Sequence, residues 1–88
     1  MINAVFLDRD GVITEDIGYV HKIEDFKLIQ NAAKGLKLLK NFKLIFITNQ
    51  SGIGRGYYKF EDFLNYNNKV LKELKKHKLK IQKTYFCP

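Results

Sequence analysis

The sequence predicts a Rossmann-like α/β fold, in which a parallel sheet carries helices on both faces and the elements follow the order βαβαβ. Two short apolar runs, at residues 2–7 and 43–47, lack polar alternation, as is typical of strands buried in a parallel sheet, and a third strand is expected at residues 81–86. Between them lie two stretches whose apolar residues recur at helical spacing. Such alternation favours parallel strands joined by right-handed crossovers.

Length and composition predict one small domain covering residues 1–88. A hydrophobic fraction of 45% supports a core, while six Gly and one Pro argue against a flexible linker. We find no signal peptide and no run of about 18 to 20 apolar residues that could span a bilayer. The single cysteine, Cys87, forms no internal disulfide. We therefore expect a soluble, cytoplasmic protein with no membrane partner.

The first expected strand, Ile2–Leu7, runs directly into Asp8, Arg9 and Asp10. Like charges repel there and little apolar surface is buried, so the abrupt change needs a chemical explanation. Residues 8–26 contain turn glycines and no long hydrophobic period, which predicts a loop or a small flap.

A helix is expected next, with Asn31 as its N-cap, because Asn is a residue type that caps helix N-termini. One apolar stripe follows at helical spacing: Ala32, Ala33, Leu36, Leu39 and Phe42. The second strand is expected at Lys43–Ile47, and a glycine-rich loop, TNQSGIGRG, follows it at residues 48–56.

A longer helix is expected from Phe60 to a point between His77 and Lys80. Its stripe is apolar at every position but one: Phe60, Phe63, Leu64, Asn67, Val70, Leu71 and Leu74. The run Ile81–Phe86 then predicts the third strand.

Basic residues outnumber acidic ones by 16 to 9, which gives a formal net charge of +7. Such an excess invites a nucleic-acid interpretation. Much of it, however, is lysine at residues 69–83, on the polar side of a helix and its exit. Only Arg9 and Arg55 supply guanidinium groups, which read phosphate and guanine best. We therefore expect a solvated lysine surface and no nucleic-acid partner.

The carboxyl ends of the first two strands carry the candidate site. In open parallel sheets ligands bind beyond these ends. Here Asp8 and Asp10 follow the first strand, and Thr48–Ser51 follow the second. Carboxylates beside an anionic phosphate need a divalent cation between them, and Mg²⁺ prefers hard oxygen ligands. The sequence therefore predicts a site for a phosphate and a divalent cation such as Mg²⁺.

Phosphoryl transfer is the chemistry that these groups support. Asp8 is expected to attack phosphorus and form an aspartyl phosphate. Asp10 is expected to protonate the leaving oxygen and then to deprotonate the attacking water. Thr48 and amides of the glycine-rich loop are expected to hold the phosphoryl oxygens.

Other interpretations of these motifs are weaker. DRDG is compatible with an acidic turn, because Asp-rich turns that end in Gly are common. A calcium loop needs further ligands at alternate positions, but Gly11 and Val12 follow Asp10. GIGRG matches the dinucleotide fingerprint poorly, since Tyr57 stands where the last glycine is needed. Phosphoryl chemistry is favoured over the acidic turn.

Four ordered motifs resemble the haloacid dehalogenase-like phosphatases. FLDRDGVI resembles their first, Asp-bearing motif, and FITNQSG resembles their second, Thr-bearing motif. With DIGYVHKIEDFKLI and YFCP, they are similar to the branch that hydrolyses heptose bisphosphate in lipopolysaccharide precursor synthesis, close kin of the histidinol phosphatases. The resemblance runs from residue 4 to residue 88.

The resemblance implies a role for each matched residue. Asp8 matches the nucleophile and Mg²⁺ ligand, and Asp10 matches the acid/base whose backbone carbonyl also binds the metal. The flap that contacts the sugar phosphate is matched by Asp16, Ile17, Gly18 and Tyr19. The loop that holds the transferred phosphoryl group is matched by Thr48, Asn49, Gln50 and Ser51. Cys87 matches the first of four ligands of a structural zinc.

The resemblance covers only the amino-terminal part of such a domain. The other zinc ligands, a phosphate-clamping lysine with its neighbouring arginine, and an aspartate that completes the Mg²⁺ shell have no match in the chain. We therefore expect an incomplete, weakly active or inactive portion of a monomeric sugar-phosphate phosphatase. A histidinol-phosphate phosphatase, a polynucleotide 3'-phosphatase and a non-catalytic interaction remnant are the alternatives. Arg9 and the GYV segment argue against the polynucleotide enzyme.

Overall fold

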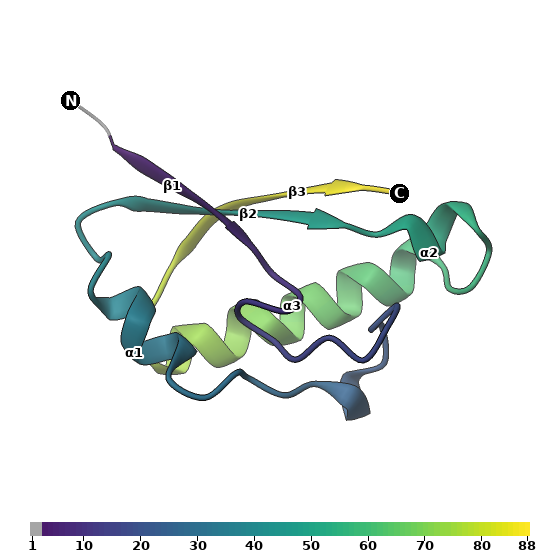
Figure 1. The fold of residues 1–88 in the computed structure, drawn as a ribbon, viewed down its shortest axis with the longest axis horizontal. Helices are drawn as coiled ribbons and strands as arrows, with labels where there is room; N and C mark the ends of the chain where they lie inside the picture. The colour runs from purple at the N-terminus through teal and green to yellow at the C-terminus, as the bar shows by residue number, and fades with distance from the viewer. Residues whose placement is uncertain (1–2) are drawn as a thin grey trace.

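The computed structural model of the chain describes residues 3–88. Three strands form one sheet in the order β1-β2-β3, and both strand pairs are parallel (Figure 1). The strands are β1 (Ala4–Asp8), β2 (Lys43–Asn49) and β3 (Ile81–Cys87). The predicted parallel α/β sheet is confirmed, and each strand ends one or two residues later than expected. Ile2, which the sequence predicts in the first strand, lies outside the described residues.

The strand register brings the candidate site to one edge of the sheet. Asp8 at the end of β1 pairs with Ile47, and the next residue of β2, Thr48, pairs with Phe86 of β3. Neighbouring strands lie about 4.8 Å apart. The segments that follow β1 and β2 therefore leave the sheet beside each other.

The longest helix, α3 (Phe60–Lys76), begins where the sequence predicts. Its start is stabilised by the Lys59 amide, which donates to the Asp62 carboxylate at 2.8 Å. No helix within residues 3–88 is both long enough and apolar enough to cross a membrane.

The helix α1 (Ala32–Lys37) is shorter than the expected helix, whose stripe extends to Phe42. Asn31 precedes α1 with a φ of 68°, and its side chain makes no capping hydrogen bond. The expected Asn31 cap is therefore wrong. Asn adopts this left-handed conformation more readily than most residues, so Asn31 acts as a turn residue instead.

Two short helical turns form inside segments that the sequence predicts as loops. The 3-10 turn η1 (Ile23–Asp25) lies in the flap after β1, and α2 (Ser51–Gly54) lies in the glycine-rich segment after β2. The second motif is therefore a strand end followed at once by a single helical turn.

Both α1 and α3 lie on the same side of the sheet (Figure 1), which differs from the expected helices on both faces. The strand order explains the difference, because two right-handed crossovers that step in the same direction place their helices on one face. The opposite face exposes Phe6 (60%), Ile47 (45%) and Tyr85 (49%). Phe6 pairs with Ile45, and Ile47 pairs with Tyr85. We call these four residues the uncovered face.

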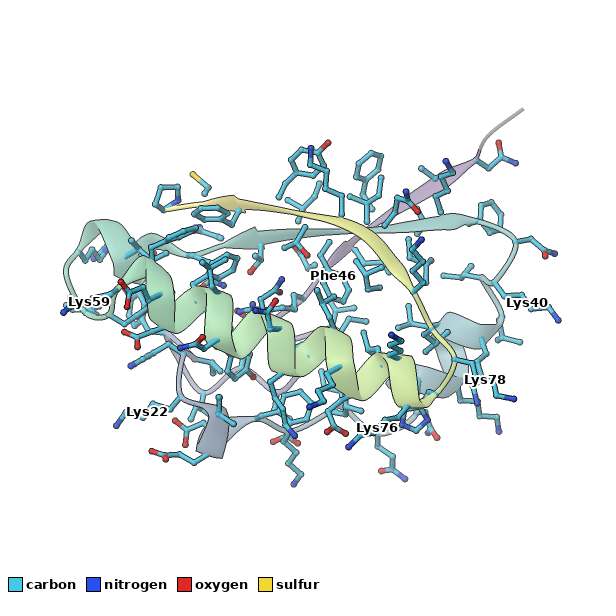
Figure 2. All side chains as sticks on the ribbon, turned by 180° about the vertical axis from the view of Figure 1, so that it is seen from behind. Lys22, Lys40, Phe46, Lys59, Lys76 and Lys78 are labelled. Carbon is cyan, nitrogen blue, oxygen red and sulfur yellow. The ribbon has the colours of Figure 1, made fainter. Side chains whose placement is uncertain are left out.

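The hydrophobic core lies between the sheet and α3. Phe46 is fully buried there, as Figure 2 shows. The buried residues of α3 are Phe63, Tyr66, Asn67, Val70 and Leu74. The stripe predicts all of these except Tyr66, whereas two of its members are exposed, Phe60 at 44% and Leu64 at 40%.

Lysine side chains project from the periphery of the molecule in Figure 2. The labelled ones are all exposed: Lys22, Lys40, Lys59, Lys76 and Lys78. Their exposure agrees with the solvated lysine surface that the sequence predicts.

Candidate active site

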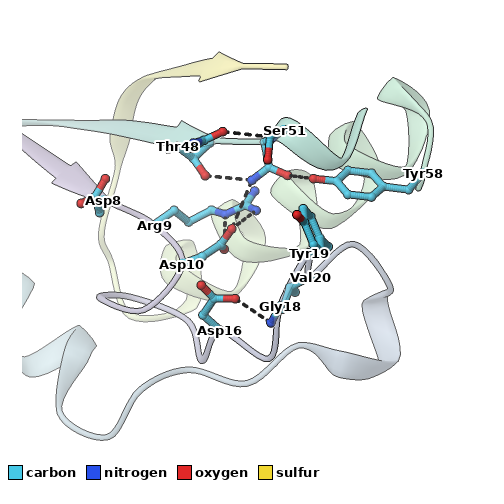
Figure 3. A pocket seen from close by; sticks show the side chains of 12 residues that line it. Asp8, Arg9, Asp10, Asp16, Gly18, Tyr19, Val20, Thr48, Ser51 and Tyr58 are labelled. Atoms are coloured by element: carbon cyan, nitrogen blue, oxygen red, sulfur yellow. Dashed lines mark hydrogen bonds and ion pairs between the residues drawn. The ribbon is translucent and has the colours of Figure 1, made fainter. Parts of the chain in front are cut away.

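A cavity of about 390 Å³ opens at the carboxyl ends of β1 and β2 (Figure 3). Three segments of the chain build it: the end of β1, the flap that follows, and the end of β2 with its helical turn. The lining residues are Asp8, Arg9, Asp10, Asp16, Gly18, Tyr19, Val20, Thr48, Asn49, Gln50, Ser51 and Tyr58. The structure thus brings together all the expected site residues except Ile17 and Cys87.

Asp8 is an exposed carboxylate of the site. It is the last residue of β1, and its side chain makes no hydrogen bond or ion pair with any residue of the described chain. Thr48, by contrast, is only 3% exposed. A carboxylate without a protein partner at a cavity mouth is available both to a cation and to an electrophile.

Asp10 is held by four side-chain donors. Its Oδ1 accepts from Arg9 Nε at 2.8 Å and from the Thr14 hydroxyl at 3.1 Å. Its Oδ2 accepts from Arg9 Nη2 at 2.9 Å and from Gln50 Nε2 at 3.1 Å. A carboxylate offers about four lone-pair sites, so every site is occupied. The position of Asp10 is therefore fixed from both strand ends.

Gln50 links the two motifs from a buried position, since it is only 2% exposed. Its Nε2 donates to Thr48 Oγ1 at 2.8 Å as well as to Asp10, and its Oε1 accepts from the Tyr58 hydroxyl. Burial raises the pKa of Tyr58 above its ordinary value of 10, so this hydroxyl stays protonated at neutral pH. The Gln50 amide group is thus occupied by protein partners.

The glycine-rich segment offers fewer free amides than its sequence suggests. The Gln50 amide donates to the Cys87 carbonyl at 2.7 Å, and the Ser51 amide donates to Asn49 Oδ1 at 3.0 Å. The expectation that amides of this loop hold the phosphoryl oxygens therefore does not hold for these two. The Thr48 hydroxyl has its oxygen occupied by Gln50, which leaves its own proton free to donate.

The flap forms the outer wall of the cavity. The Gly18 amide donates to Asp16 Oδ1 at 2.8 Å, and Gly18 has a φ of 89°, which favours glycine. Tyr19 packs edge-on against Tyr57 at 4.8 Å. Ile17, which the resemblance assigns to the same flap, is 64% exposed and lies outside the lining.

Close packing of aromatic rings joins the flap to the second motif. The His21 ring stacks on Tyr58 with a centroid distance of 4.4 Å. Gly52 lies against the same tyrosine, and a Cβ atom at this position would overlap the Tyr58 ring and press on Tyr19. Glycine is therefore required at position 52 by a close approach and not by its backbone angles.

The donors at the cavity mouth fit Mg²⁺. The Asp8 carboxylate is free of protein partners, and the Asp10 carbonyl oxygen accepts no backbone hydrogen bond within residues 3–88. Mg²⁺ is typically held by one or two carboxylates together with several waters. Zinc does not fit, because Cys87 is exposed and the described part of the chain groups no three His, Cys, Asp or Glu side chains around a metal position.

Four side chains that complete the site were missed by sequence reasoning: Arg9 as a partner of Asp10, and Thr14, Tyr58 and Asn67. Two of them carried a signal. Arg9 stands between two residues of the cavity, so strand alternation points it towards the core. Asn67 is the only polar residue in the apolar stripe of α3, and a buried amide needs a polar partner.

Comparison with curated proteins finds relatives along nearly the whole chain. The D-glycero-alpha-D-manno-heptose-1,7-bisphosphate 7-phosphatase of Campylobacter jejuni is 49% identical over 87 residues, which are 97% of this chain and 51% of that protein. The beta-anomer enzyme of Haemophilus influenzae is 40% identical over 90 residues, which cover 49% of it. The chain spans about half the length of the curated relatives it matches. No protein-family profile matches the chain.

Solved structures share the fold. A protein of Mesorhizobium loti described as a HAD-like phosphatase superposes with a TM-score of 0.89 at 30% identity, over 98% of this chain and 42% of that one. The D,D-heptose 1,7-bisphosphate phosphatase of B. bronchiseptica, solved with magnesium and phosphate, also gives 0.89, at 20% identity over 99% of this chain and 50% of its own.

Proposed function

This chain is a homologue of the heptose-1,7-bisphosphate 7-phosphatases with the fold of the haloacid dehalogenase-like phosphatases, and on that premise we propose that its cavity carries the chemistry of a Mg²⁺-dependent sugar-phosphate phosphatase. The proposed substrate is heptose 1,7-bisphosphate, cleaved at the 7-phosphate. One observation carries the proposal: Asp8, Asp10 and Thr48 line one cavity at the carboxyl ends of neighbouring strands.

The first step transfers the phosphoryl group to Asp8. A carboxylate oxygen of Asp8 bonds to phosphorus while the bond from phosphorus to the sugar oxygen breaks. Asp10 gives a proton to that departing oxygen, so the sugar leaves as a neutral alcohol. Asp8 suits this role because its carboxylate has no competing protein partner within residues 3–88.

The second step returns Asp8 to its starting state. Asp10, now a carboxylate, takes a proton from a water molecule while the water oxygen bonds to phosphorus and the Asp8–phosphorus bond breaks. Inorganic phosphate leaves, and Asp10 again carries the proton that it needs for the next substrate.

The remaining lining residues bind and orient the substrate. Thr48 donates its free hydroxyl proton to a phosphoryl oxygen, beside the side chains of Asn49 and Ser51. The flap residues Asp16, Gly18 and Tyr19 contact the sugar, whereas Ile17 of the same flap lies outside the lining. The Asp8 carboxylate and the Asp10 carbonyl oxygen would hold Mg²⁺, which when bound neutralises charge between Asp8 and the phosphate.

We also propose that this chain is one portion of a larger phosphatase domain. It spans about half the length of its relatives, and the uncovered face and the free edge of β1 are the surfaces that further strands and helices would cover. A zinc ion on Cys87 would need ligands from that further portion. The complete enzyme is proposed to be a cytoplasmic monomer.

Nucleic acid is not included among the proposed partners. Arg9 is fully buried and paired with Asp10, so Arg55 is the remaining arginine that could reach a phosphate backbone.

Phosphate release from heptose 1,7-bisphosphate in Mg²⁺ tests the proposal. We would compare the chain with a chimera in which the chain replaces the matching half of the Campylobacter enzyme, and this chimera with its Asp8→Asn and Asp25→Asn variants. We expect turnover by the chimera, its loss with Asp8→Asn, and its retention with Asp25→Asn. Turnover that survives Asp8→Asn would refute the mechanism.

Parallel substrates separate the alternatives. If the chimera prefers histidinol phosphate or a 3'-phosphorylated oligonucleotide, that compound would replace heptose 1,7-bisphosphate as the proposed substrate. No turnover of any substrate by either form would favour the non-catalytic remnant.

A further inference from the structure

Arg9 is the only buried cation in residues 3–88, with an exposed fraction of 0%. Removing a cation from water costs several kcal/mol unless it is well paired. Although Arg9 borders the cavity, its guanidinium group is closed off from solvent and therefore from a substrate phosphate. Its charge must act on the protein.

The partner of Arg9 is the carboxylate of the very next residue. Nε donates to Asp10 Oδ1 at 2.8 Å and Nη2 donates to Oδ2 at 2.9 Å, as Figure 3 shows. Two parallel bonds to one carboxylate fix its orientation as well as its charge. A lysine ammonium at the same place is a point charge and cannot fix the plane of the carboxylate.

Arg9 is itself held by Asn67 of α3, which in turn is bonded to β3. Nη1 donates to Asn67 Oδ1 at 3.1 Å, and Asn67 Nδ2 donates to the Thr84 hydroxyl of β3 at 3.2 Å. The guanidinium group lies 4.9 Å from the ring centre of Tyr66 and 5.5 Å from that of Phe63. These contacts leave the guanidinium little freedom to turn.

We propose that Arg9 is the positioning residue that fixes the Asp10 carboxylate for proton transfer, an inference that rests on the proposed phosphatase function. Arg9 holds both oxygens of Asp10 from the core side. Gln50 is the donor that can release Oδ2, because its amide is neutral and its 3.1 Å bond is longer than the 2.9 Å bond from the charged Arg9. Oδ2 then receives or gives the reacting proton while Arg9 keeps the carboxylate in place.

Leaving-group dependence tests this role in the chimera. An alkyl phosphate such as the sugar phosphate needs a proton on its departing oxygen, whereas p-nitrophenyl phosphate releases a stable anion without one. Loss of Arg9 should therefore spare the first turnover of p-nitrophenyl phosphate, which phosphorylates Asp8. It should slow sugar-phosphate turnover and the later hydrolysis of the aspartyl phosphate.

We expect Arg9→Met to lower kcat for the sugar phosphate about 100-fold or more, since a positioned acid/base contributes about 10²- to 10⁴-fold. KM should change less than about threefold, because Arg9 does not touch the substrate. A full p-nitrophenolate burst followed by slow turnover should remain. Arg9→Lys, which keeps the buried cation, guards against a fold defect in Arg9→Met and should show the same pattern at a smaller loss. Arg55→Met, the change of the exposed arginine, is the matched control and should behave as the unchanged chimera.

Equal loss of burst and turnover in both Arg9 variants would show a purely structural role and overturn the proposal. Turnover within about twofold of the unchanged chimera would overturn it as well, since a positioned group contributes far more.

A second measurement needs no turnover. In the ¹⁵N-labelled chain the Arg9 Nε–H signal should exchange slowly with water and should shift in Asp10→Asn, whereas the Arg55 signal should exchange fast and stay in place. Fast exchange at Arg9 would refute the pair itself. If the Arg9 signal exchanges slowly but the chimera is inactive, the proposed function is refuted, whereas the pairing of Arg9 with Asp10 is not.

Discussion

Gln50→Glu is the substitution whose effect the site geometry specifies most closely. The two side chains have nearly the same shape, so the change opens no cavity. It replaces the Nε2 donor, 3.1 Å from Asp10 Oδ2, with an oxygen. Two charged carboxylates at that separation repel by about 5 kcal/mol at an effective dielectric constant of 20.

The folded variant can avoid this repulsion by keeping the introduced carboxyl group protonated. From an ordinary pKa of about 4.3, protonation at pH 7 costs about 3.7 kcal/mol, which is less than the repulsion. The free energy of unfolding should therefore fall by about 4 kcal/mol at pH 7 and by about 1 kcal/mol at pH 5. The sign follows because the pKa of the introduced carboxyl group is raised in the folded state, so the loss grows as the pH rises above the unfolded pKa.

Urea unfolding followed by circular dichroism, in EDTA at pH 5 and pH 7, measures this difference. Gln30→Glu makes the same chemical change at an exposed turn and should alter the free energy of unfolding by less than about 0.5 kcal/mol at either pH. A loss for Gln50→Glu that is the same at both pH values would show that Gln50 does not face Asp10 in solution.

Three further outcomes are expected. Hydrogen bonds from Lys69 and Lys76 lower the pKa of Glu73 to about 2, so its stabilising contribution is present above its ordinary pKa of 4.5 and is lost as the pH falls towards 2. Glu73→Gln should therefore reduce the fall in the free energy of unfolding over this pH range, whereas Glu24→Gln should leave that fall unchanged. The buried Tyr66 hydroxyl has no hydrogen-bond partner within residues 3–88. Tyr66→Phe should therefore raise the free energy of unfolding by about 1 kcal/mol and raise Tm by about 4 to 8 °C in a thermal melt. A lower Tm would contradict this prediction. Phe6→Ser on the uncovered face should reduce self-association of the chain in sedimentation, whereas Val12→Ser, at an exposed loop position, should leave it unchanged.

The strands and α3 could be predicted because local patterns determine them. A continuous apolar run such as residues 44–47 of β2 has few alternatives to a buried strand, and the stripe of α3 repeats at helical spacing over four turns. The α1 helix was predicted less well. Asn31 suits both an N-cap and a left-handed turn, and the choice between them depends on the path of the chain before it.

The residues of the site also divide into those that the sequence could predict and those that it could not. Asp8, Asp10 and Thr48 could be assigned to one cavity because strand ends in a parallel sheet meet at one edge. Gln50 could not be assigned its links to Asp10 and Tyr58, because its partners lie 40 and 8 residues away in the sequence. Sequence spacing alone carries no information about such contacts.

The sequence by itself therefore determined the parallel sheet, the edge at which the site lies and the acidic pair that carries the proposed chemistry, because each depends on local pattern and strand order. Only the tertiary structure decided that Arg9 turns back onto Asp10, that Asn67 meets it from α3, and that one face of the sheet stays uncovered. The physical reason is burial. A side chain removed from water must satisfy its charge and hydrogen bonds with whatever groups the folded chain brings beside it.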